Sequence, residues 1–492
     1  MADMKTPGVY VVEQNAFPNS VVQVETAVPA FIGYTLKANN QGKSLLNVPF
    51  RISSAAEFAE YFGGAPTPVF YITEIPSSSA PGKNVIPLKG KDYAVTCALK
   101  LEQQFLLYAS MQLFFQNGGA ACYIVSVGDY SAAIDPNQLT MGIDLLEKQQ
   151  EPTLVVIPDA MHLPEEATCI NVQQHALKHC GNVMKNRLAI LDIYDGFQNN
   201  PQADPIANFR ADIGTEFLDF AAAYYPWIET NVFQPSNIGY TCLESKQLAA
   251  LLTAEAALPA DVISEVIKLN KFTESSLNAT LPQRSKVYKS ILQEILRQLN
   301  TLPPSGAIAG IYTRVDSTQG VWKAPANTGI FNCVAPTVNV SDKDQQALNV
   351  DVLEGKSINA IRNFSAQGTL VWGARTLDGN SLDWRYINVR RTMIMLEQSI
   401  LLAAKAYVFE PNEAATWSTI KTMIQNFLTG IWKQGGLVGS APADAFSVSC
   451  GLGETMTAQD ILVGILRVTV LVAVTRPAEF IEITFQQQMQ KS

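Results

Sequence analysis

Short apolar runs alternate with segments of helical periodicity in the first half of the chain, and this alternation constrains the fold more than any other feature of the sequence. Strands that are apolar throughout are buried on both faces, which is typical of a parallel sheet covered by helices. The pattern therefore predicts an α/β domain with a largely parallel sheet. The expected strands are Val28–Thr35, Ala121–Val127, Leu154–Asp159, Arg187–Tyr194 and Ala221–Trp227.

Helices are expected between these strands, where apolar residues recur every three or four positions. A long one runs from Tyr93 to Asn117 and is followed by Gly118–Gly119, a pair that is typical of a helix end. Further helices are expected at 140–150, 164–184 and 206–217. These helices would cover the two faces of the sheet.

The character of the chain changes near Leu302–Gly306, a segment that contains two prolines and a glycine. Before this segment, residues 244–299 are helical by pattern. Beyond it we expect a strand at Ile308–Val315 and helices at Ser381–Phe409 and Glu413–Trp432. The second part of the chain is therefore predicted to form an α+β domain.

The last thirty residues combine two kinds of strand-like sequence. The fourteen residues of Ile461–Val474 are almost wholly apolar and rich in β-branched side chains, which predicts a strand in the core of the subunit. This run is shorter than the roughly 20 residues that cross a bilayer. After Arg476–Pro477, the segment Glu479–Gln486 largely alternates between polar and apolar residues. A terminal strand needs an edge to pair with, and the sheet of another chain could provide one.

Composition limits the classes of function. A chain of 492 residues is too long for one ordinary core and indicates two or more domains. Its net charge of −9 argues against a general affinity for nucleic acid, and a charged share of 16% favours extensive protein contacts. Seven cysteines form no disulfide framework, and the first residues contain no apolar stretch typical of a signal peptide. We therefore expect synthesis and assembly in a reducing cytoplasm.

One cluster of residues could hold a metal ion, because all three histidines of the chain fall within it. His175 and His179 lie one helical turn apart, but their spacing relative to the cysteines fits no structural zinc site. An ordinary helix face is therefore the preferred interpretation, and no metal or cofactor is expected. The cluster comprises His162, Cys169, His175, His179 and Cys180.

Two glycine-containing segments only imitate nucleotide-binding motifs. Gln41–Ser44 resembles the end of a phosphate loop, but Lys37 stands where that loop needs its first glycine. Gly451–Gly453 is followed by Met456 where a dinucleotide fingerprint needs a glycine. Both segments are interpreted as turns.

Acidic residues at the ends of the expected strands occupy a common position of active sites in α/β sheets. Helix capping and loop polarity explain Asp159, Asp192 and Asp195 equally well. Because no nucleophile, base and orienting group come together in the sequence, catalytic residues are not expected.

Several segments, in one order along nearly the whole chain, resemble the contractile tail sheath proteins of myophages and of phage-tail-like contractile injection systems. The resemblance is strongest in the C-terminal third of the chain. The segments are PGVYVVE from Pro7, FIGYT from Phe31, LFFQNGGAACYIVSVG from Leu113, GIYTRVDSTQGVWKAPAN from Gly310, VWGARTL from Val371, INVRRTMIMLEQSI from Ile387, FEPNEAATW from Phe409 and RPAEFIEITF from Arg476.

This resemblance implies a structural subunit that stacks as six-membered rings around an inner tube and contracts from an extended, metastable state. It implies an N-terminal arm and linker at 1–28, an outer α/β domain at 29–305, an inner domain at 306–476 and a C-terminal arm at 477–492. The helical region of about 230–302 has no counterpart in the matched segments.

In the family, both arms add strands to inner-domain sheets of neighbouring subunits. Carried onto this chain, the N-terminal arm strand is Val9, Tyr10, Val11, Val12 and Glu13. The C-terminal arm strand is Phe480, Ile481, Glu482, Ile483, Thr484 and Phe485.

The matched segments also single out charged residues. Lys421 and Lys433 could meet acidic groups of the inner tube, while a purely internal role of the same helix in the core remains open. Arg390, Arg391 and Arg476 could form ion pairs between subunits, although a solvated or internal pair is the ordinary expectation.

The expected partners are further copies of the chain, an inner tube protein, and baseplate and terminal cap proteins, with no nucleic acid and no direct insertion into a membrane. We expect assembly in the bacterial cytoplasm, followed by a role in a virion tail or a released extracellular particle. An α/β enzyme with a C-terminal oligomerisation domain is the alternative, and a tail-tube or baseplate protein is a third interpretation.

Overall fold

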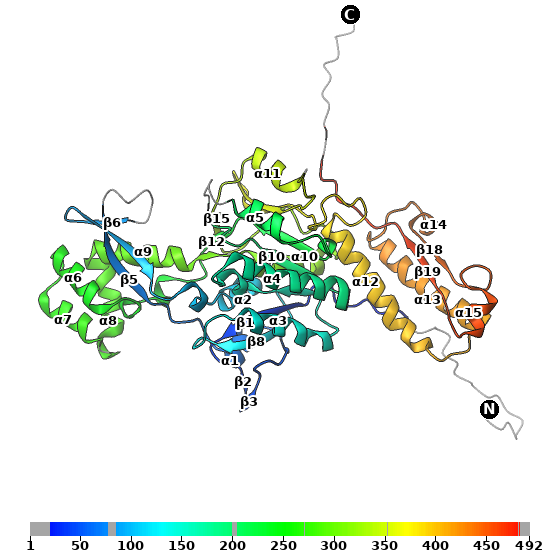
Figure 1. Cartoon of the computed structure of the whole chain (residues 1–492), viewed down its shortest axis with the longest axis horizontal. Helices are drawn as coiled ribbons and strands as arrows, with labels where there is room; N and C mark the ends of the chain where they lie inside the picture. The colour runs from blue at the N-terminus through cyan, green and yellow to red at the C-terminus, as the bar shows by residue number, and fades with distance from the viewer. Residues whose placement is uncertain are drawn as a thin grey trace, which may run out of the picture. The chain divides into compact units, whose positions relative to one another are not determined.

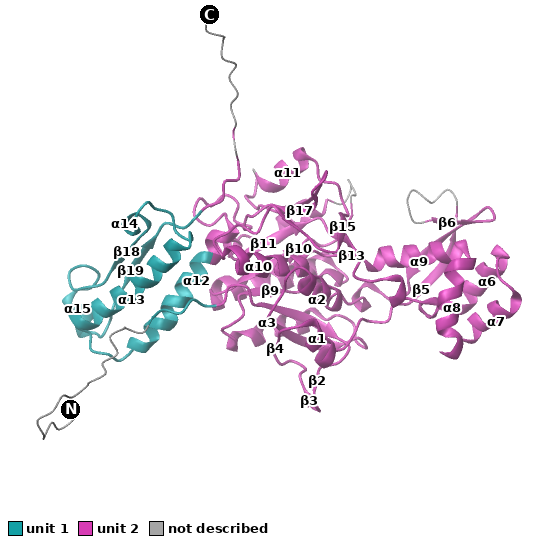
Figure 2. Cartoon of the chain, turned by 180° about the vertical axis from the view of Figure 1, so that it is seen from behind, with its two compact units in different colours: residues 1–24, 392–475 teal, residues 25–391, 476–492 magenta. Residues whose placement is uncertain are grey.

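The computed structural model describes residues 20–76, 85–198, 204–269, 271–351, 353–480 and 482. The chain divides into two compact units, coloured separately in Figure 2. Unit 1 comprises Met1–Val24 and Thr392–Thr475, and unit 2 comprises Glu25–Arg391 and Arg476–Ser492. The division falls inside helix α12 (Ile387–Ala404), so the chain passes from unit 2 to unit 1 without leaving a helix.

The centre of unit 2 is a nine-stranded sheet with the strand order β14-β17-β16-β11-β10-β9-β1-β8-β4 (Figure 1). The strands from β16 to β8 run parallel, whereas β4, and β17 with β14, add antiparallel edges. The predicted α/β class with a largely parallel sheet is thereby confirmed. The bounds are β1 Pro29–Thr35, β4 Phe50–Ile52, β8 Cys122–Asp129, β9 Leu154–Val156, β10 Leu188–Asp192, β11 Ala221–Tyr225, β14 Thr328–Gly329, β16 Asn359–Phe364 and β17 Gly368–Trp372.

The parallel strands form where the sequence predicts them. Every residue of β1, β9, β10 and β11 is buried, as expected for strands that are covered on both faces. Helices pack around them, and most lie close to their expected positions. Their bounds are α1 Ala55–Phe62, α2 Leu107–Gln116, α3 Pro136–Asp144, α4 Glu166–Lys178, α5 Pro205–Asp212, α10 Ser305–Gln319 and α11 Asp342–Asn349.

Helix α10 corrects the expected strand at Ile308–Val315. The segment opens with small residues that let α10 pack directly on α2: a Cβ added to Gly306 would lie 2.5 Å from the Ser110 carbonyl oxygen, and one added to Gly310 would lie 2.4 Å from that of Phe114. The β-branched residues of this segment suggested a strand. Their spacing of three and four positions instead suits a helix, and most residues of α10 are buried.

A lobe of unit 2 is built from two stretches that lie far apart in the sequence. Helices α6 to α9 pack on the small sheet β5-β7-β6 and share a separate apolar core with it (Figure 1). The bounds are β5 Phe70–Ile75, β6 Val85–Leu88, β7 Lys91–Cys97, α6 Ser245–Glu255, α7 Ala260–Lys268, α8 Lys271–Arg284 and α9 Lys286–Leu299. The helical pattern of 244–299 is confirmed. The expected helix from Tyr93 is wrong in its first part, because Tyr93 and its neighbours pair with β5 and β6.

Unit 2 also contains two smaller groups of strands. They are a three-stranded sheet, β13-β12-β15, and a hairpin, β2–β3. Their bounds are β2 Asn39–Asn40, β3 Lys43–Ser44, β12 Ile228–Thr230, β13 Thr301–Leu302 and β15 Cys333–Pro336.

Unit 1 contains the C-terminal part of α12, then α13 (Ala414–Lys433) and α14 (Pro442–Ala445), and a small antiparallel sheet of β18 (Phe446–Ser449) and β19 (Thr469–Val472). The predicted helix at Glu413–Trp432 is confirmed, and the one at Ser381–Phe409 is present as the shorter α12. No helix in the described part of the chain is both long and apolar enough to cross a membrane.

The expected buried strand at Ile461–Val474 is wrong. The segment begins with the helix α15 (Ala458–Leu462), which starts at a capping box formed by Thr457 and Asp460. Only Thr469–Val472 then pairs as a strand, and Leu462 and Leu471 are 81% and 64% exposed. The capping box thus places the first two residues of the run in a helix, and the apolar side chains of the run are exposed or only partly buried.

The compact units do not coincide with the predicted domain limits. The large sheet combines six strands from before residue 305 with three from after it. The six are β1, β4, β8, β9, β10 and β11, and the three are β14, β16 and β17. The predicted limits at 28, 305 and 476 stay a prediction that rests on the family resemblance. The described fold divides after Arg391.

Candidate intersubunit site at the bases of the arms

The segment that leads into the predicted C-terminal arm is fixed to unit 2 by a partly buried carboxylate. Glu479 accepts hydrogen bonds from Arg375 Nη2 at 2.6 Å and Nε at 3.0 Å, from Asn349 Nδ2 at 2.9 Å and from the Tyr386 hydroxyl at 3.2 Å. The side chains of Arg375 and Glu479 are 5% and 20% exposed. We call these four residues the arm anchor.

Electrostatics favour the charged form of Glu479. Burial would raise the pKa of its carboxyl, but the hydrogen bonds from Arg375 and Asn349 outweigh burial and hold the pKa below its ordinary value. A charged fork of this kind is stronger than a hydrogen bond between neutral groups. The arm anchor is therefore fully formed at neutral pH.

Arg375 is itself held by the large sheet. Its main-chain N–H donates to Asn359 Oδ1 at 2.8 Å, and Asn359 Nδ2 donates to the carbonyl oxygens of Arg375 and Ala223 at 2.8 and 3.1 Å. Gly373 permits this approach, because a Cβ there would lie 2.7 Å from Asn359 Oδ1. The arm anchor is thus connected to β16 and β11 through one asparagine.

A second buried ion pair lies at the base of the N-terminal arm. Arg391 donates from Nη2 and Nη1 to Asp316 at 2.6 and 2.9 Å, and its Nη2 also donates to the Thr26 carbonyl oxygen at 2.9 Å. The Thr26 hydroxyl completes the triangle by donating to Asp316 at 2.5 Å. The side chains of Arg391 and Asp316 are 3% and 6% exposed. The segments that adjoin the two predicted arms thus each contact an arginine–carboxylate pair that is largely enclosed.

The other two arginines singled out by the sequence also have partners within unit 2. Arg390 lies 3.5 Å from Asp219, and its guanidinium stacks 3.7 Å above the ring of Phe220. Arg476 donates to the Leu382 carbonyl oxygen at 2.9 Å and is exposed. In the isolated subunit, all three arginines thus make the internal contacts that were the ordinary expectation.

The predicted arm strands fall mostly outside the described residues. Val9, Tyr10, Val11, Val12 and Glu13 lie outside them, as do Ile481, Ile483, Thr484 and Phe485. Phe480 and Glu482 are described, and both are exposed.

The sheet of unit 1 offers edges to a further strand. Within the described residues, β18 pairs with β19 and with no other strand. The ladder is short, extending from Phe446 opposite Val472 to Ser449 opposite Thr469. Such a sheet presents unpaired main-chain groups to an added strand.

Helix α13 packs one face into unit 1 and exposes the other. Ile420, Ile424 and Leu428 are buried, which bears out the core role considered for this helix. Lys421 lies 3.5 Å from Glu454, and Lys433 at the end of the helix is exposed. Of the two lysines considered for an inner tube, Lys433 is the more accessible.

The histidine and cysteine cluster does not assemble. His175 Nε2 lies 2.6 Å from Asp144 Oδ1, while His179 Nε2 lies 3.2 Å from Arg187 Nη1. Burial raises the pKa of the Cys180 thiol to about 12 and that of Cys169 well above its ordinary range, so both remain protonated. Within the described ranges, no three His, Cys, Asp or Glu side chains are grouped to hold a metal.

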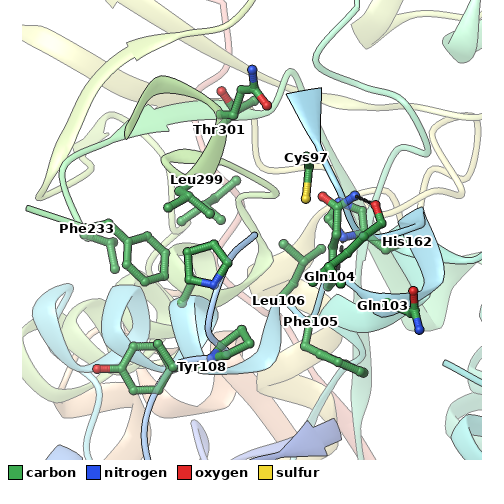
Figure 3. A pocket seen from close by; sticks show the side chains of 18 of the residues that line it. Cys97, Gln103, Gln104, Phe105, Leu106, Tyr108, His162, Phe233, Leu299 and Thr301 are labelled. Atoms are coloured by element: carbon green, nitrogen blue, oxygen red, sulfur yellow. Dashed lines mark hydrogen bonds between the residues drawn. The ribbon is translucent and has the colours of Figure 1, made fainter. Parts of the chain in front are cut away.

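The third histidine lines a cavity of about 560 Å³ between the lobe and the large-sheet part of unit 2. Figure 3 shows His162 beside Gln104, whose carbonyl oxygen lies 2.5 Å from His162 Nδ1. Burial lowers the pKa of His162 to about 4, so the ring is neutral and can donate this hydrogen bond. Much of the remaining lining is apolar and includes Phe105, Leu106 and Phe233.

Two of the three acidic strand ends, Asp159 and Asp192, bind main-chain donors at helix starts. Asp159 accepts hydrogen bonds from the main-chain N–H groups of Tyr34, Leu106 and Leu107, the last two at the start of α2. Asp192 accepts one from the N–H of Ser305 at the start of α10. These carboxylates thus satisfy main-chain donors at helix starts. The two glycine-containing segments are turns, as interpreted: Gly42 closes the β2–β3 hairpin, and Gly453 has a positive φ of 78°.

Sequence reasoning missed the arm anchor. Arg375 and Glu479 lie in two of the segments that resemble tail sheath proteins, VWGARTL and RPAEFIEITF, but they are 104 positions apart in the sequence. Each is a charged residue within a largely apolar stretch of sequence. This pattern is the one feature that could have indicated a charge with a partner inside the fold. Nothing in the local pattern shows that the two charges meet.

Comparison with known proteins supports the same class of protein. Residues 379–488 match the family model of the phage tail sheath C-terminal domain. The tail sheath protein of Vibrio phage KVP40 is 32% identical over 136 residues, which are 28% of this chain and 20% of that protein. The chain thus matches about a fifth of the length of this curated relative.

Solved structures extend the likeness to nearly the whole chain. The sheath complex of the extracellular contractile injection system PVC in its contracted state is 27% identical, with a TM-score of 0.61 and coverage of 99% of both chains. The helical sheath of the anti-feeding prophage in its contracted state is 26% identical, with a TM-score of 0.62 and coverage of 99% of this chain and 100% of that chain. In fold and in sequence, this chain is similar to contractile tail sheath proteins, and the predicted resemblance is confirmed.

Proposed function

We propose that this chain is the structural sheath subunit of a contractile injection apparatus. Subunits stack as hexameric rings around an inner tube and contract from a metastable extended state, which drives the tube through a target envelope. The observation that carries this proposal is the likeness of the whole fold to sheath chains that were solved in a contracted state.

Strand exchange through the arms joins the subunits. The β18–β19 sheet has edges that an added strand can pair with, and the strands proposed to occupy them are the N-terminal and C-terminal arms of neighbouring subunits. Main-chain hydrogen bonds would supply the adhesion. The exposed apolar side chains Leu462, Val463 and Leu471 of unit 1 support a surface that is covered in an assembly.

The stroke requires no catalytic residue in this chain. Subunits that are tied by arms can rotate and repack while each stays joined to its neighbours. The carboxylates that resemble an α/β active site, Asp159 and Asp192, are occupied by helix N-termini, which gives the alternative of an enzyme little support. We propose that a free-energy difference per subunit, summed over the sheath, powers contraction without nucleotide hydrolysis.

The proposed partners follow from the same role. An inner tube protein would meet the exposed end of α13 near Lys433, and baseplate and cap proteins would close the two ends of the polymer. A similar chain occurs in the baseplate of the anti-feeding prophage. Assembly in a bacterial cytoplasm and later release, as a virion tail or an extracellular particle, complete the proposal.

Electron microscopy of the purified full chain in negative stain tests the proposal. Striated hollow tubes are expected, and discrete small oligomers in every condition would contradict it. A truncation after Phe480 removes all of the predicted C-terminal arm strand except Phe480 and keeps the arm anchor at Glu479. This variant should fold with normal thermal stability and form no tubes, whereas normal tubes would refute strand exchange by the C-terminal arm.

A further inference from the structure

The path of the chain near its C-terminus raises a mechanical question. β19 ends at Val472 in unit 1, and the chain re-enters unit 2 at Arg476, shortly before the arm. The β18–β19 ladder is only four residue pairs long, and Val472 lies at its end opposite Phe446. Between the ladder and the arm, Val474 forms an isolated bridge with Leu437, and the Thr475 hydroxyl donates to the Gly435 carbonyl oxygen at 3.0 Å. If the arm were held by unit 1 alone, a pull on the arm would break these contacts first and would then open the ladder one pair at a time from Val472.

The arm anchor interrupts this path. We propose that the hydrogen bonds of Glu479 with Arg375, Asn349 and Tyr386 transmit tension from the C-terminal arm directly into the large sheet of unit 2, so that unit 1 is not loaded. The inference rests on the proposed function, because it assumes that the arm is pulled by a neighbouring subunit. It assigns to Arg375 and Glu479 a positioning role that is separate from strand exchange itself.

The geometry of the arm anchor suits this role. Arg375 binds the carboxylate through two nitrogens, and its Nη1 donates to the Asn349 carbonyl oxygen at 3.1 Å, so the guanidinium is fixed from two sides. Asn359 then connects the main chain of Arg375 to Ala223 of β11 in the middle of the sheet. Tension at Glu479 therefore reaches several strands, whose hydrogen bonds share the load in parallel.

Neighbouring contacts are poor substitutes. The ion pair of Arg476 with Asp383 is exposed and has an N–O distance of 3.8 Å. Solvent and salt screen such a pair, so it contributes little to holding the chain. Beyond the arm anchor, the side chain of Phe480 is already exposed. Glu479 is thus the last described residue at which unit 2 holds the chain through a charged and largely enclosed contact.

Single-molecule force spectroscopy on the monomeric full chain tests the inference without polymerisation. One handle is attached through a peptide tag after Ser492 and the other through a tag inserted at Gly42, in the exposed turn between β2 and β3 of unit 2. Unfolding of the segment Thr392–Thr475 of unit 1 lengthens the tether by roughly 280 Å, at about 3.3 Å per residue. This step identifies the moment at which unit 1 enters the path of the force.

In the wild-type chain, unit 1 enters that path only after the arm anchor has broken. In Glu479→Gln, which keeps the size of the side chain but removes its charge, the step of roughly 280 Å should occur at a clearly lower force. Arg375→Lys keeps the positive charge but loses the two-nitrogen fork, so it should give an intermediate force. Equal force distributions for the wild type and both variants would overturn the inference.

A matched control separates the effect from a general loss of charge. Glu74 forms an ion pair with Lys91 in which both side chains are more than half exposed, at 51% and 56%. Glu74→Gln makes the same chemical change as Glu479→Gln and should leave the force of the step unchanged. A lowered force in Glu74→Gln would show that the effect is not specific to the arm anchor, and this too would overturn the inference.

The outcome is independent of the proposed function. If the chain forms no tubes but Glu479→Gln lowers the force, the sheath role fails while the arm anchor holds. If tubes form and the force is unchanged, the sheath role holds and the arm anchor fails as a mechanical element. Circular dichroism of each variant before pulling confirms that the starting fold is native, and Arg375→Lys provides the test if Glu479→Gln does not fold.

Discussion

Replacing Asp316 by asparagine removes the negative charge that neutralises Arg391 at the base of the N-terminal arm. The carboxylate accepts two hydrogen bonds from Arg391, at 2.6 and 2.9 Å, and one from the Thr26 hydroxyl at 2.5 Å. The two charged side chains are almost fully enclosed. An asparagine retains one oxygen acceptor but turns an N–H₂ group towards donors, so at least one of these hydrogen bonds is lost.

The magnitude follows from burial. Removing one partner of a buried ion pair leaves an uncompensated charge in the interior, which typically costs about 3–5 kcal/mol. Because the asparagine oxygen preserves part of the acceptor role, we expect Asp316→Asn to lower the free energy of unfolding of unit 2 by about 3 kcal/mol. The exposed pair of Glu74 and Lys91 gives the control, since Glu74→Gln should cost only about 0–1 kcal/mol.

Urea unfolding of the full chain measures this difference. Unit 1 and unit 2 can unfold in separate transitions, so each must be fitted by its own probe. Hydrogen exchange followed by mass spectrometry supplies the local readout, because the Val28 N–H donates to Thr153 Oγ1 and the Thr26 carbonyl is held by Arg391. In Asp316→Asn, exchange at residues 24–28 should increase.

Two results would refute the reasoning. A change in unfolding free energy no larger than that of Glu74→Gln would show that the buried pair contributes no more than an exposed one. Unchanged exchange at residues 24–28 would show that Asp316 does not hold the base of the N-terminal arm.

The remaining predictions concern a buried carboxyl group and two helix glycines. Burial raises the pKa of Asp192 to about 7, so the folded chain favours the protonated carboxyl group. The stability that this protonated group contributes is fully present below the pKa of aspartate in the unfolded chain, and it is lost as the pH rises through about 7. The wild type should therefore lose thermal stability between about pH 4 and pH 7. Asp192→Asn, which keeps an oxygen acceptor for the Ser305 N–H, should remove this loss. An unchanged pH profile of the melting temperature would contradict the prediction. Gly310→Ala should destabilise the chain by about 1–3 kcal/mol, because the new Cβ would meet the Phe114 carbonyl oxygen at 2.4 Å. Gly430→Ala, in an open position of α13, should be neutral or stabilising by up to about 1 kcal/mol, and similar melting temperatures for the two glycine variants would contradict the packing argument.

The large sheet was predictable because burial on both faces dictates sequence directly. A strand such as β10 is buried at every position and is apolar up to its last residue, Asp192. The order of the strands was not predictable. β16 joins the sheet beside β11 through contacts between residues more than 130 positions apart, which local periodicity does not encode.

Two of the errors concern β-branched residues, which are also tolerated where packing or capping favours a helix. In α10, Ile308, Ile311 and Val315 are buried in a helix because Gly306 and Gly310 let its main chain touch α2. In the run from Ile461, local capping rather than packing favours the helix. A capping box starts α15 just before the run, so the first residues of the run are helical. Tertiary packing and local capping thus outweigh strand propensity, which spans only about 1 kcal/mol per residue.

The two ion pairs next to the arms, Arg375 with Glu479 and Arg391 with Asp316, could not be predicted from the sequence. Each joins residues that lie far apart in the chain. A buried ion pair contributes little net stability compared with apolar residues of the same size, but it tolerates few alternative arrangements. For an arm that adds a strand to another subunit, this property has a direct consequence. A slip of one residue exchanges the two faces of a strand, so the arm must leave its own subunit at a defined residue. The hydrogen bonds between Glu479 and Arg375 can define this residue. After a slip of one position, Ala478 or Phe480 would face Arg375, and neither side chain can accept these hydrogen bonds. On this argument, the same pair that would divert tension from unit 1 also fixes the register in which the arm meets its neighbour.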